Sequence, residues 1–440
     1  MSKTILFEGR NLTLKKGTGI ATYARNLTAI AKQQGFRAEV VIGTDRPIHR
    51  AAASLSEVML LDAHKAANSP GLQAIKSYVR GLLPVPFGIK TKPVEWSGMV
   101  IHPARANLLA EFSTTHAAYD LFEAADQHLI RFGRRAKLNV PSPDLFHATH
   151  PTPLMVRGCP NIYTIHDLVP LRLPYATLDK KGLFFDTVKC LARDADHIVT
   201  VSEHSRRDII EFLGIDEKRV TNTYQAVSLP KALTDRPMDE VETDLANIFH
   251  LERDGYFLFV GAIEPKKNVA ALIDAYVASG SRHPLILAGG LGWQYDEDLA
   301  KIEDPRFISY RIVDGTIRTH RQVRHHAYVP LAHLVSLMRG ARGVLFPSLY
   351  EGFGLPVLEA MALGTPVMTS NVSSLPEIAG DAALLVDPYD RDQMAKAIRS
   401  LDGDEGLRAD LRQRGQVQAA LFSPERYSER IASLYKSVLG

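Results

Sequence analysis

Hydrophobic residues in this chain fall into two alternating patterns. Short, mostly apolar runs that end in glycine, proline or polar residues are typical of strands buried on both faces of a parallel sheet. Stretches such as 20–34 and 269–277 instead place apolar residues on one face of a helix. The alternation predicts an α/β protein with parallel sheets and covering helices. The predicted strands lie at 4–7, 40–43, 144–150, 161–168, 197–202, 219–227, 256–261, 284–288, 307–310, 343–346, 366–370 and 383–386.

The length and punctuation of the chain predict two domains. A chain of 440 residues exceeds the size at which single hydrophobic cores usually stop growing. Pro230 and Pro237 lie in a polar, acidic stretch, which is typical of an exposed linker. We therefore predict a first domain at 1–228 and a second at 229–420, the second with six strands in a doubly wound pattern.

Two segments have ambiguous patterns. Residues 72–87 mix apolar residues with Lys76 and Arg80, and further basic residues cluster within 131–137. Such a stripe either packs onto a core or lies on a membrane as an amphipathic helix with basic flanks, and both interpretations stay open. The second segment is an arginine-rich insertion that ends with the pair His325-His326, which we predict to be loop.

The charge balance argues against a dedicated nucleic-acid binder. The chain carries 52 lysines and arginines against 49 aspartates and glutamates, a formal net charge of +3. Residues 1–150 hold 19 basic and 11 acidic residues, which suits an anionic acceptor, a membrane surface or a plain solvated face. The sequence shows neither a long apolar run nor a signal-like start, so we expect a cytoplasmic protein in which Cys159 and Cys190 are reduced.

The most informative stretch is residues 347–366, which follows a predicted buried strand. Pro356 suits the first turn of a helix, so the preceding residues are expected to form a strand-to-helix loop. Gly352 and Gly354 allow a ligand to approach the backbone, and the free N–H groups at a helix start favour an anion. We therefore expect a phosphate group to bind here.

Two carboxylates flank this anion site, Glu351 in the loop and Glu359 in the helix. Carboxylates repel a phosphate, so we expect them to accept hydrogen bonds from hydroxyl groups, as a sugar or a ribose would supply. An ordinary strand–turn–helix of an α/β core explains the glycines and Pro356 equally well. It explains the two glutamates less well.

Further candidates follow other strands. Gly261 ends an apolar strand, and Lys266 and Lys267 follow it, where ammonium groups can neutralise a diphosphate. The glycine-rich loop 17–19 also leads into a helix. A dinucleotide-binding fingerprint needs a third glycine where Thr22 stands, so we reject nicotinamide binding.

Histidines mark the carboxyl ends of strands in the first domain. His166 lies at such an end, where functional side chains of parallel sheets gather, although it could simply cap the strand by bonding Asp167. His147, His150 and His166 could together be the ligands of a metal ion. Residues three apart on a strand point to opposite faces, however, and the sequence offers no evident carboxylate or cysteine partner. We therefore expect no metal site.

Several of these segments together resemble one enzyme family. Residues 347–366 resemble the Glu-x7-Glu signature of the retaining, nucleotide-sugar-dependent glycosyltransferases of GT-B architecture, a family-4-like group rich in bacterial mannosyltransferases. The segments 17–23, 164–167 and 264–268 resemble further parts of that family. The resemblance implies two doubly wound Rossmann-like domains facing across a cleft, the first for the acceptor and the second for the nucleotide sugar. It also implies a last helix, within 421–440, that crosses back to the first domain.

The resemblance also implies residue roles. His166 would face the transferred sugar, Glu351 would bind its hydroxyls and Lys267 would clamp the donor diphosphate, so these three are the candidate catalytic residues. The family's arginine after the strand glycine is missing, because Ala262 stands there, and Lys266 is the candidate substitute. The implied donor-binding residues are Gly19, Gly261, Lys266, Lys267, Val329, Glu351, Gly352, Phe353, Gly354, Leu355 and Glu359.

The implied activity is retaining transfer of a hexose, with GDP-mannose as the best candidate donor, to a saccharide or lipid-linked saccharide in bacterial surface polysaccharide synthesis. Lysines and a helix terminus supply the positive charge, so we expect no metal and no cofactor. The alternatives are a UDP-hexose donor, a GT-B sugar-nucleotide epimerase or hydrolase, and an inactive sugar-binding subunit. The expected partners are the nucleotide sugar and its acceptor, not nucleic acid, and peripheral membrane contact through the basic first domain stays open.

Overall fold

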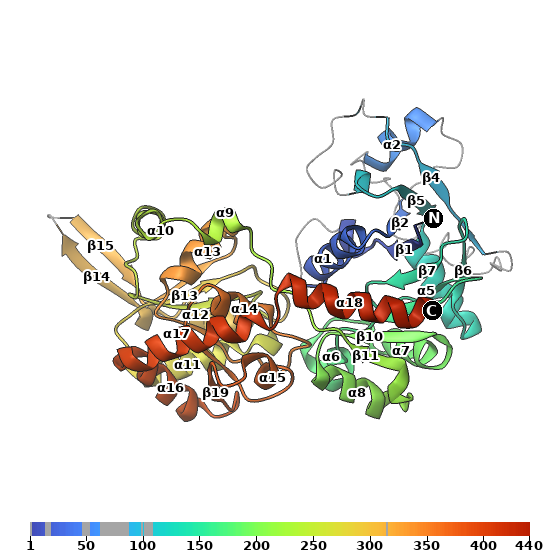
Figure 1. Cartoon of the computed structure of the whole chain (residues 1–440). Helices are drawn as coiled ribbons and strands as arrows, with labels where there is room; N and C mark the ends of the chain where they lie inside the picture. Colours follow the sequence, from blue (N-terminus) through green and yellow to red (C-terminus); the bar gives the residue numbers. More distant parts are fainter. Residues whose placement is uncertain are drawn as a thin grey trace.

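Figure 1 shows the computed structural model of the chain, in which two α/β units lie next to each other. Each unit is built on one large, mainly parallel sheet, as the sequence pattern predicts. Among the residues described, none of the helices is long and apolar enough to span a membrane. The exact domain boundary at 228 stays a prediction. The structure describes residues 2–13, 19–45, 53–61, 88–97, 100, 109–313 and 316–440.

The described part of the first unit is built on an eight-stranded sheet. All neighbouring strands are parallel except the edge pair β4 and β5. The sequence pattern predicts every strand of this sheet except those two. In spatial order the strands are β11 (Val220–Asn222), β10 (His197–Thr200), β9 (Asn161–Thr164), β7 (Leu145–Ala148), β1 (Thr4–Glu8), β2 (Arg37–Thr44), β5 (Thr114–Tyr119) and β4 (Lys92–Val94).

Helices bury both faces of this sheet. On β1, Ile5 and Phe7 point into one buried cluster and Leu6 into another, which is why the strand is apolar throughout. Helices on either face supply Leu27 to the first cluster and Leu191 to the second. A small parallel sheet of β3 (Ile89–Lys90), β6 (Ala136–Asn139) and β8 (Leu154–Val156) lies beside the main one. The helices of this unit are α1 (Gly19–Gln33), α2 (Ala53–Leu61), α5 (Leu121–Phe132), α6 (Val169–Arg172), α7 (Lys181–Asp194) and α8 (Glu203–Leu213).

The described part of the second unit is built on a six-stranded parallel sheet. Its spatial order is β16 (Val323–His326), β13 (Leu285–Ala288), β12 (Phe257–Val260), β17 (Gly343–Phe346), β18 (Val367–Ser370) and β19 (Leu384–Val386). Strands β12, β13 and β17 are buried throughout, as expected of strands covered on both faces. The helices are α9 (Lys231–Thr234), α10 (Met238–Asp244), α11 (Val269–Ser279), α12 (Asp296–Ile302), α13 (Leu331–Gly340), α14 (Leu355–Ala362), α15 (Leu375–Ala379), α16 (Arg391–Gly403) and α17 (Glu405–Ala420).

Two sequence predictions in this unit are wrong. The run 307–310 does not join the main sheet but begins β14 (Ile308–Val313), which forms an antiparallel hairpin with β15 (Thr316–Arg321). The sixth strand is instead β16, which contains the histidine pair predicted to be loop. An edge strand has a neighbour on one side only, so its side chains are less enclosed and polar residues are tolerated there. His325 uses its ring Nε2 to bond the Gly289 carbonyl oxygen at 2.7 Å, so its polarity is satisfied within the fold.

The last helix, α18 (Pro424–Leu439), lies along the first unit (Figure 1). Its Tyr435 hydroxyl and the Nδ1 of His147 on β7 are 2.9 Å apart. Gln34 donates to the Ser428 carbonyl oxygen at 2.8 Å, and Lys3 donates to the Leu439 carbonyl oxygen at 3.1 Å. The C-terminal segment therefore ties the second unit to the first.

A second tie joins the two units through α15. The Glu377 carboxylate accepts hydrogen bonds from the backbone N–H groups of Glu203 and His204, at 3.0 and 2.9 Å. These are the first two residues of α8, where a negative charge is favoured by the helix dipole. The Trp293 indole N–H donates to the Ala176 carbonyl oxygen at 3.0 Å as a further contact between the units. The structure thus holds the two units against each other.

Candidate active site

The start of α14 has the geometry that the sequence predicts for an anion site. The buried strand β17 ends at Phe346, and α14 begins at Leu355 with Pro356 in its first turn. Gly354 caps the helix with a φ of +115°, in the left-handed region that favours glycine. No side chain caps this helix start. Pro356 has no N–H and the Val357 N–H donates to the Gly354 carbonyl oxygen at 3.0 Å, which leaves the Leu355 N–H of the first turn for an anion.

Two lysines face the loop before α14. The Lys267 ammonium donates to Glu351 Oε1 at 2.6 Å. The Lys266 ammonium lies 3.7 Å from the other oxygen, Oε2, and 3.6 Å from Glu264. The Leu349 N–H donates to the Lys266 carbonyl oxygen at 2.8 Å, which joins the two loops through their backbones. The lysines thus stand where the charge of a diphosphate would be neutralised.

Burial opposes charge on all three of these groups, so their mutual attraction decides the outcome. Burial favours neutral Glu351, but the ammonium groups of Lys266 and Lys267 outweigh it and lower the pKa of the carboxyl. Burial also opposes the charge on Lys266, but Glu351 and Asp167 raise the pKa of its ammonium. Burial lowers the pKa of Lys267, and Lys266 adds to this effect against the pull of Glu351. An ionised Glu351 is thus held by positive charge from two directions.

Beside the lysines, two strand ends that carry glycines approach each other closely. Gly261 follows β12 with a φ of +148°, and Gly289 follows the neighbouring β13. A Cβ atom on Gly289 would stand 1.9 Å from the Gly261 carbonyl oxygen, which excludes any side chain there. Val329 follows the next strand, β16, and is half-buried in the same row of strand ends. Gly261 and Val329 therefore lie at the carboxyl ends of the strands of this sheet, on the same side as the lysines.

His166 is contributed by the first unit, directly beyond β9. Its ring Nε2 lies 3.0 Å from the Thr149 carbonyl oxygen, so this nitrogen carries the proton and donates. The alternative bond to Asp167 is not made, since Asp167 accepts from the Val169 N–H instead. Burial lowers the pKa of His166 to about 4. The ring is therefore neutral near pH 7, and the lone pair on Nδ1 can accept a hydrogen bond.

The two units meet at this point. A Cβ atom on Gly352 would stand 2.7 Å from Asp167 Oδ2 and 2.9 Å from the His166 carbonyl oxygen. Gly19, the first residue of α1, approaches the motif from the same side, because a Cβ atom there would lie 3.9 Å from Leu355 Cδ1. The other glycines of the loop 17–19 lie outside the described residues. The structure therefore brings the first-unit candidates against the start of α14.

Glu359 stands apart from the lysine cluster. Within the described residues its carboxyl has no hydrogen-bond or ion-pair partner, and burial alone raises its pKa to about 7. The side chain is half-buried, so part of it remains reachable from solvent. An unpartnered acceptor recessed in the protein suits the hydroxyl groups of a ribose, which donate without adding charge.

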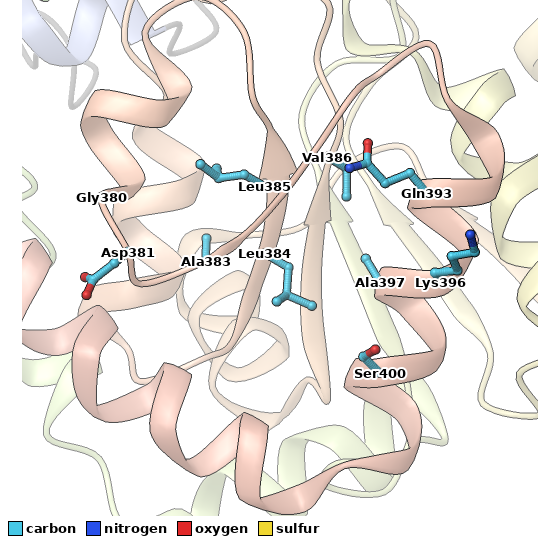
Figure 2. A pocket seen from close by; sticks show the side chains of 10 residues that line it. All are labelled: Gly380, Asp381, Ala383, Leu384, Leu385, Val386, Gln393, Lys396, Ala397 and Ser400. Carbon is cyan, nitrogen blue, oxygen red and sulfur yellow. The ribbon is translucent and has the colours of Figure 1, made fainter.

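A pocket of the second unit lies away from this cluster. Figure 2 shows a pocket of about 420 Å³ beside the edge strand β19, lined by residues of β19, α16 and the turn before them. The lysines and glutamates of the α14 region do not line it. Among the residues described, no three histidine, cysteine or acidic side chains are grouped to hold a metal ion. Metal independence itself stays a prediction.

Sequence reasoning missed several charged groups of this region. Asp167 and Glu264 each stand one or two residues from a predicted site residue, at a strand end, and that position was the available signal. The carboxylate partner of His150 was also missed. It is Glu8, whose Oε2 lies 2.7 Å from His150 Nδ1. His147, by contrast, points to the opposite face, as its spacing from His150 predicts.

Comparison with known proteins assigns the family. A profile of the glycosyl transferases group 1 matches residues 241–418, and a profile of glycosyltransferase family 4 matches residues 99–229. The chain is 34% identical over 281 residues to the O-antigen chain mannosyltransferase B of Escherichia coli, a match that covers 62% of this chain and 70% of that protein. The chain belongs to glycosyltransferase family 4. This confirms the resemblance that the sequence motifs indicate.

One further relative of this family 4 glycosyltransferase is longer than it, and two solved structures share its fold. The serotype-specific mannosyltransferase WbdA of Escherichia coli is 29% identical over 264 residues, but the match covers 59% of this chain and 31% of WbdA. Anabaena HepE in complex with UDP and glucose has a TM-score of 0.66 at 15% identity, over 99% of this chain and 100% of HepE. Sucrose-phosphate synthase from Thermosynechococcus elongatus has a TM-score of 0.61 at 15% identity, over 99% and 98%. The structural likenesses show the two-domain GT-B fold.

Proposed function

We propose that this glycosyltransferase moves mannose from GDP-mannose to a saccharide or lipid-linked saccharide, with retention at the anomeric carbon, during synthesis of a surface polysaccharide. The observation that carries the proposal is the buried Glu351, held by Lys266 and Lys267 before α14 and followed by Gly352, which lies against Asp167 and the His166 carbonyl oxygen of the other unit. The names of its mannosyltransferase relatives support mannose as the sugar and an O-antigen-like acceptor.

The donor diphosphate would bind between the lysines and the first turn of α14. Its negative charge grows as the bond between the anomeric carbon and the phosphate oxygen breaks. Ammonium groups and aligned N–H groups that are already in place stabilise this charge without reorganising. Glu351, displaced from Lys267 by the diphosphate, would accept hydrogen bonds from hydroxyls of the donor sugar. The ion pair seen in the structure would therefore be exchanged for two ligand contacts.

The sugar and the acceptor would meet beside His166. A neutral imidazole with its proton on Nε2 presents the Nδ1 lone pair to a sugar hydroxyl. In a retaining reaction on one face, the acceptor oxygen bonds the anomeric carbon as the phosphate oxygen leaves. The acceptor's proton passes to that leaving oxygen. The protein then needs no protonated residue as general acid, which agrees with the low pKa of His166.

A donor panel tests this proposal. The protein is incubated with GDP-mannose, UDP-glucose, UDP-galactose and dTDP-glucose, with and without octyl α-D-mannoside as the acceptor. We expect GDP-mannose to raise the melting temperature, because a ligand of the folded state stabilises it by mass action, and to yield a longer glycoside. Product formation from UDP-hexoses alone contradicts the proposed donor. Conversion of a donor without any acceptor, at a rate that the acceptor does not change, favours the epimerase or hydrolase alternative.

A further inference from the structure

We propose that His150, oriented by Glu8, binds a hydroxyl group of the acceptor sugar through its ring Nε2. The inference rests on the proposed transferase function and specifies the acceptor side of the same site. Glu8 is the last residue of β1, and His150 follows β7. Because β1 and β7 are parallel neighbours, with Phe7 opposite His147, their carboxyl ends place Glu8 and His150 at the same edge of the sheet.

The contact between the two side chains fixes the proton on the imidazole. His150 Nδ1 lies 2.7 Å from Glu8 Oε2, and the Glu8 side chain has no exposed surface. The carboxylate also accepts from the Thr149 hydroxyl at 3.2 Å and from the Arg10 N–H. A carboxylate surrounded by donors accepts from Nδ1–H, which leaves the lone pair of a neutral ring on Nε2. Glu8 thus presents His150 as an acceptor of hydrogen bonds.

The second ring nitrogen is left without a partner. His150 Nε2 is shielded from solvent and, in the described part of the chain, has no hydrogen-bond partner. Leaving a buried polar atom unpaired is unfavourable, so such an atom calls for a functional explanation. The neighbouring His147 differs, because its two nitrogens are bonded to Tyr435 and Thr164 at 2.9 and 3.1 Å. His147 is therefore structural, whereas His150 retains an unused acceptor.

The unused nitrogen lies beside the reaction centre. Thr149 joins the two histidines, because its carbonyl oxygen accepts from His166 and His150 is the next residue. The donor sugar is proposed to lie at His166, so a ligand group at His150 belongs to the acceptor. This places the acceptor hydroxyl on the first unit.

The charges nearby favour a hydroxyl over an anion. Glu8 is a buried carboxylate directly behind His150, and it would repel a phosphate or carboxylate at Nε2. A hydroxyl donates its hydrogen to Nε2 without bringing charge, and a sugar offers several hydroxyls. The geometry thus points to a neutral saccharide.

The test compares binding with turnover. Saturation-transfer NMR measures binding of octyl α-D-mannoside, and initial rates with GDP-mannose give KM for each substrate. For His150→Ala we expect weaker glycoside binding and a rise of about tenfold in acceptor KM, the loss of one hydrogen bond. KM for GDP-mannose should stay within about twofold of wild type, because its diphosphate and nucleoside are proposed to bind on the other unit and its sugar at His166. His150→Gln, whose amide oxygen can accept a hydrogen bond, should recover part of the affinity.

His128→Ala is the matched control. His128 lies on α5 in the same unit, and its Nδ1 is likewise buried with no partner in the described regions. It has no carboxylate contact among the residues described, so its removal should leave glycoside binding unchanged. Equal binding of the glycoside by wild type and His150→Ala overturns the inference, as does absence of binding by wild type. Intact binding without turnover of any donor contradicts the proposed transferase function instead.

Discussion

Glu351 shows how a single carboxylate can be kept ionised inside a protein. An isolated buried charge is costly, and here two ammonium groups compensate it. The same ammonium groups are the ones that a diphosphate needs. Glu351 is therefore stabilised by the contacts that the proposed donor would replace. Removing one lysine should affect catalysis more than folding, because the second lysine remains beside Glu351.

Lys267→Met tests this expectation. The substitution keeps the apolar stem and removes the ammonium, so we expect kcat/KM for transfer to fall about 10²- to 10³-fold. The matched control is Lys301→Met, which breaks a 2.6 Å contact to Asp274 elsewhere in the same unit. We expect the control to retain turnover. Steady-state rates measure turnover of both variants, and circular dichroism confirms that they are folded. Wild-type turnover in Lys267→Met would contradict a role of this residue in the mechanism.

Glu359→Gln should separate stability from donor binding. The pKa of Glu359 is raised from 4.5 to about 7, so the folded protein binds the extra proton in this window and stability falls as pH rises through it. At about pH 8 the free energy of unfolding of the variant should exceed that of wild type by roughly 1–2 kcal/mol. Its KM for GDP-mannose should nevertheless increase, because a neutral amide accepts ribose hydroxyls less strongly. Urea unfolding at high and low pH checks the first effect, and a variant that is less stable at high pH contradicts it.

His166 gives the opposite dependence on pH. Burial lowers its pKa from 6.5 to about 4, so the unfolded chain binds a proton that the folded chain excludes. The free energy of unfolding is therefore independent of this group above about pH 6.5. It decreases by up to roughly 3 kcal/mol as the pH falls toward about 4. His166→Gln, whose amide can still donate to Thr149, should show a shallower decline in the urea midpoint. An identical decline in the variant would show that other groups cause it.

At the same scale, sequence reasoning identified side chains better than their partners. Local motifs point to Glu351, Lys267 and His166, and the structure pairs Glu351 with Lys267 and brings the His166 carbonyl oxygen against Gly352, although their roles stay proposals. The pair Glu8 and His150 was not predicted, because 142 residues separate them along the chain. Recognising the pair requires knowing that β1 and β7 are neighbours in the sheet. No local pattern contains that information.

At the scale of elements, the start of α14 was predictable because its rules are local. Pro356 and Gly354 set the backbone angles at the helix start in any context. The strand β16 was not predictable in this way. Its polar sequence predicts a loop. It forms a strand because it pairs with β13, and this pairing depends on the tertiary structure.

Gly352→Ala tests the contact between this loop and the first unit. The added Cβ would stand 2.7 Å from Asp167 Oδ2 and 2.9 Å from the His166 carbonyl oxygen. The second unit can fold without this contact, so the variant should remain folded while the units are held apart. We expect kcat to fall at least about tenfold, because reacting groups on the two units would be displaced. Gly182→Ala, at a position with no atom within 4 Å of an added Cβ, is the control.

At the scale of the whole molecule, the site exists only where the two units meet. The contact through Glu377 and the packing of α18 hold the two units in this arrangement. The first unit supplies His166 and the proposed acceptor residue His150, and the second supplies the lysines and Glu351. Transfer therefore requires both units in contact, which also excludes water from the diphosphate.

The most direct test of this account is NMR analysis of the product formed from GDP-[1-¹³C]mannose and octyl α-D-mannoside, in the presence of EDTA. The account predicts transfer that EDTA does not slow, and a one-bond carbon–proton coupling typical of an α-mannoside, because the donor is itself α-linked. A β-linked product would contradict retention. Loss of transfer in EDTA, restored by added magnesium, would contradict the claim that lysines and the start of α14 carry the charge of the leaving diphosphate.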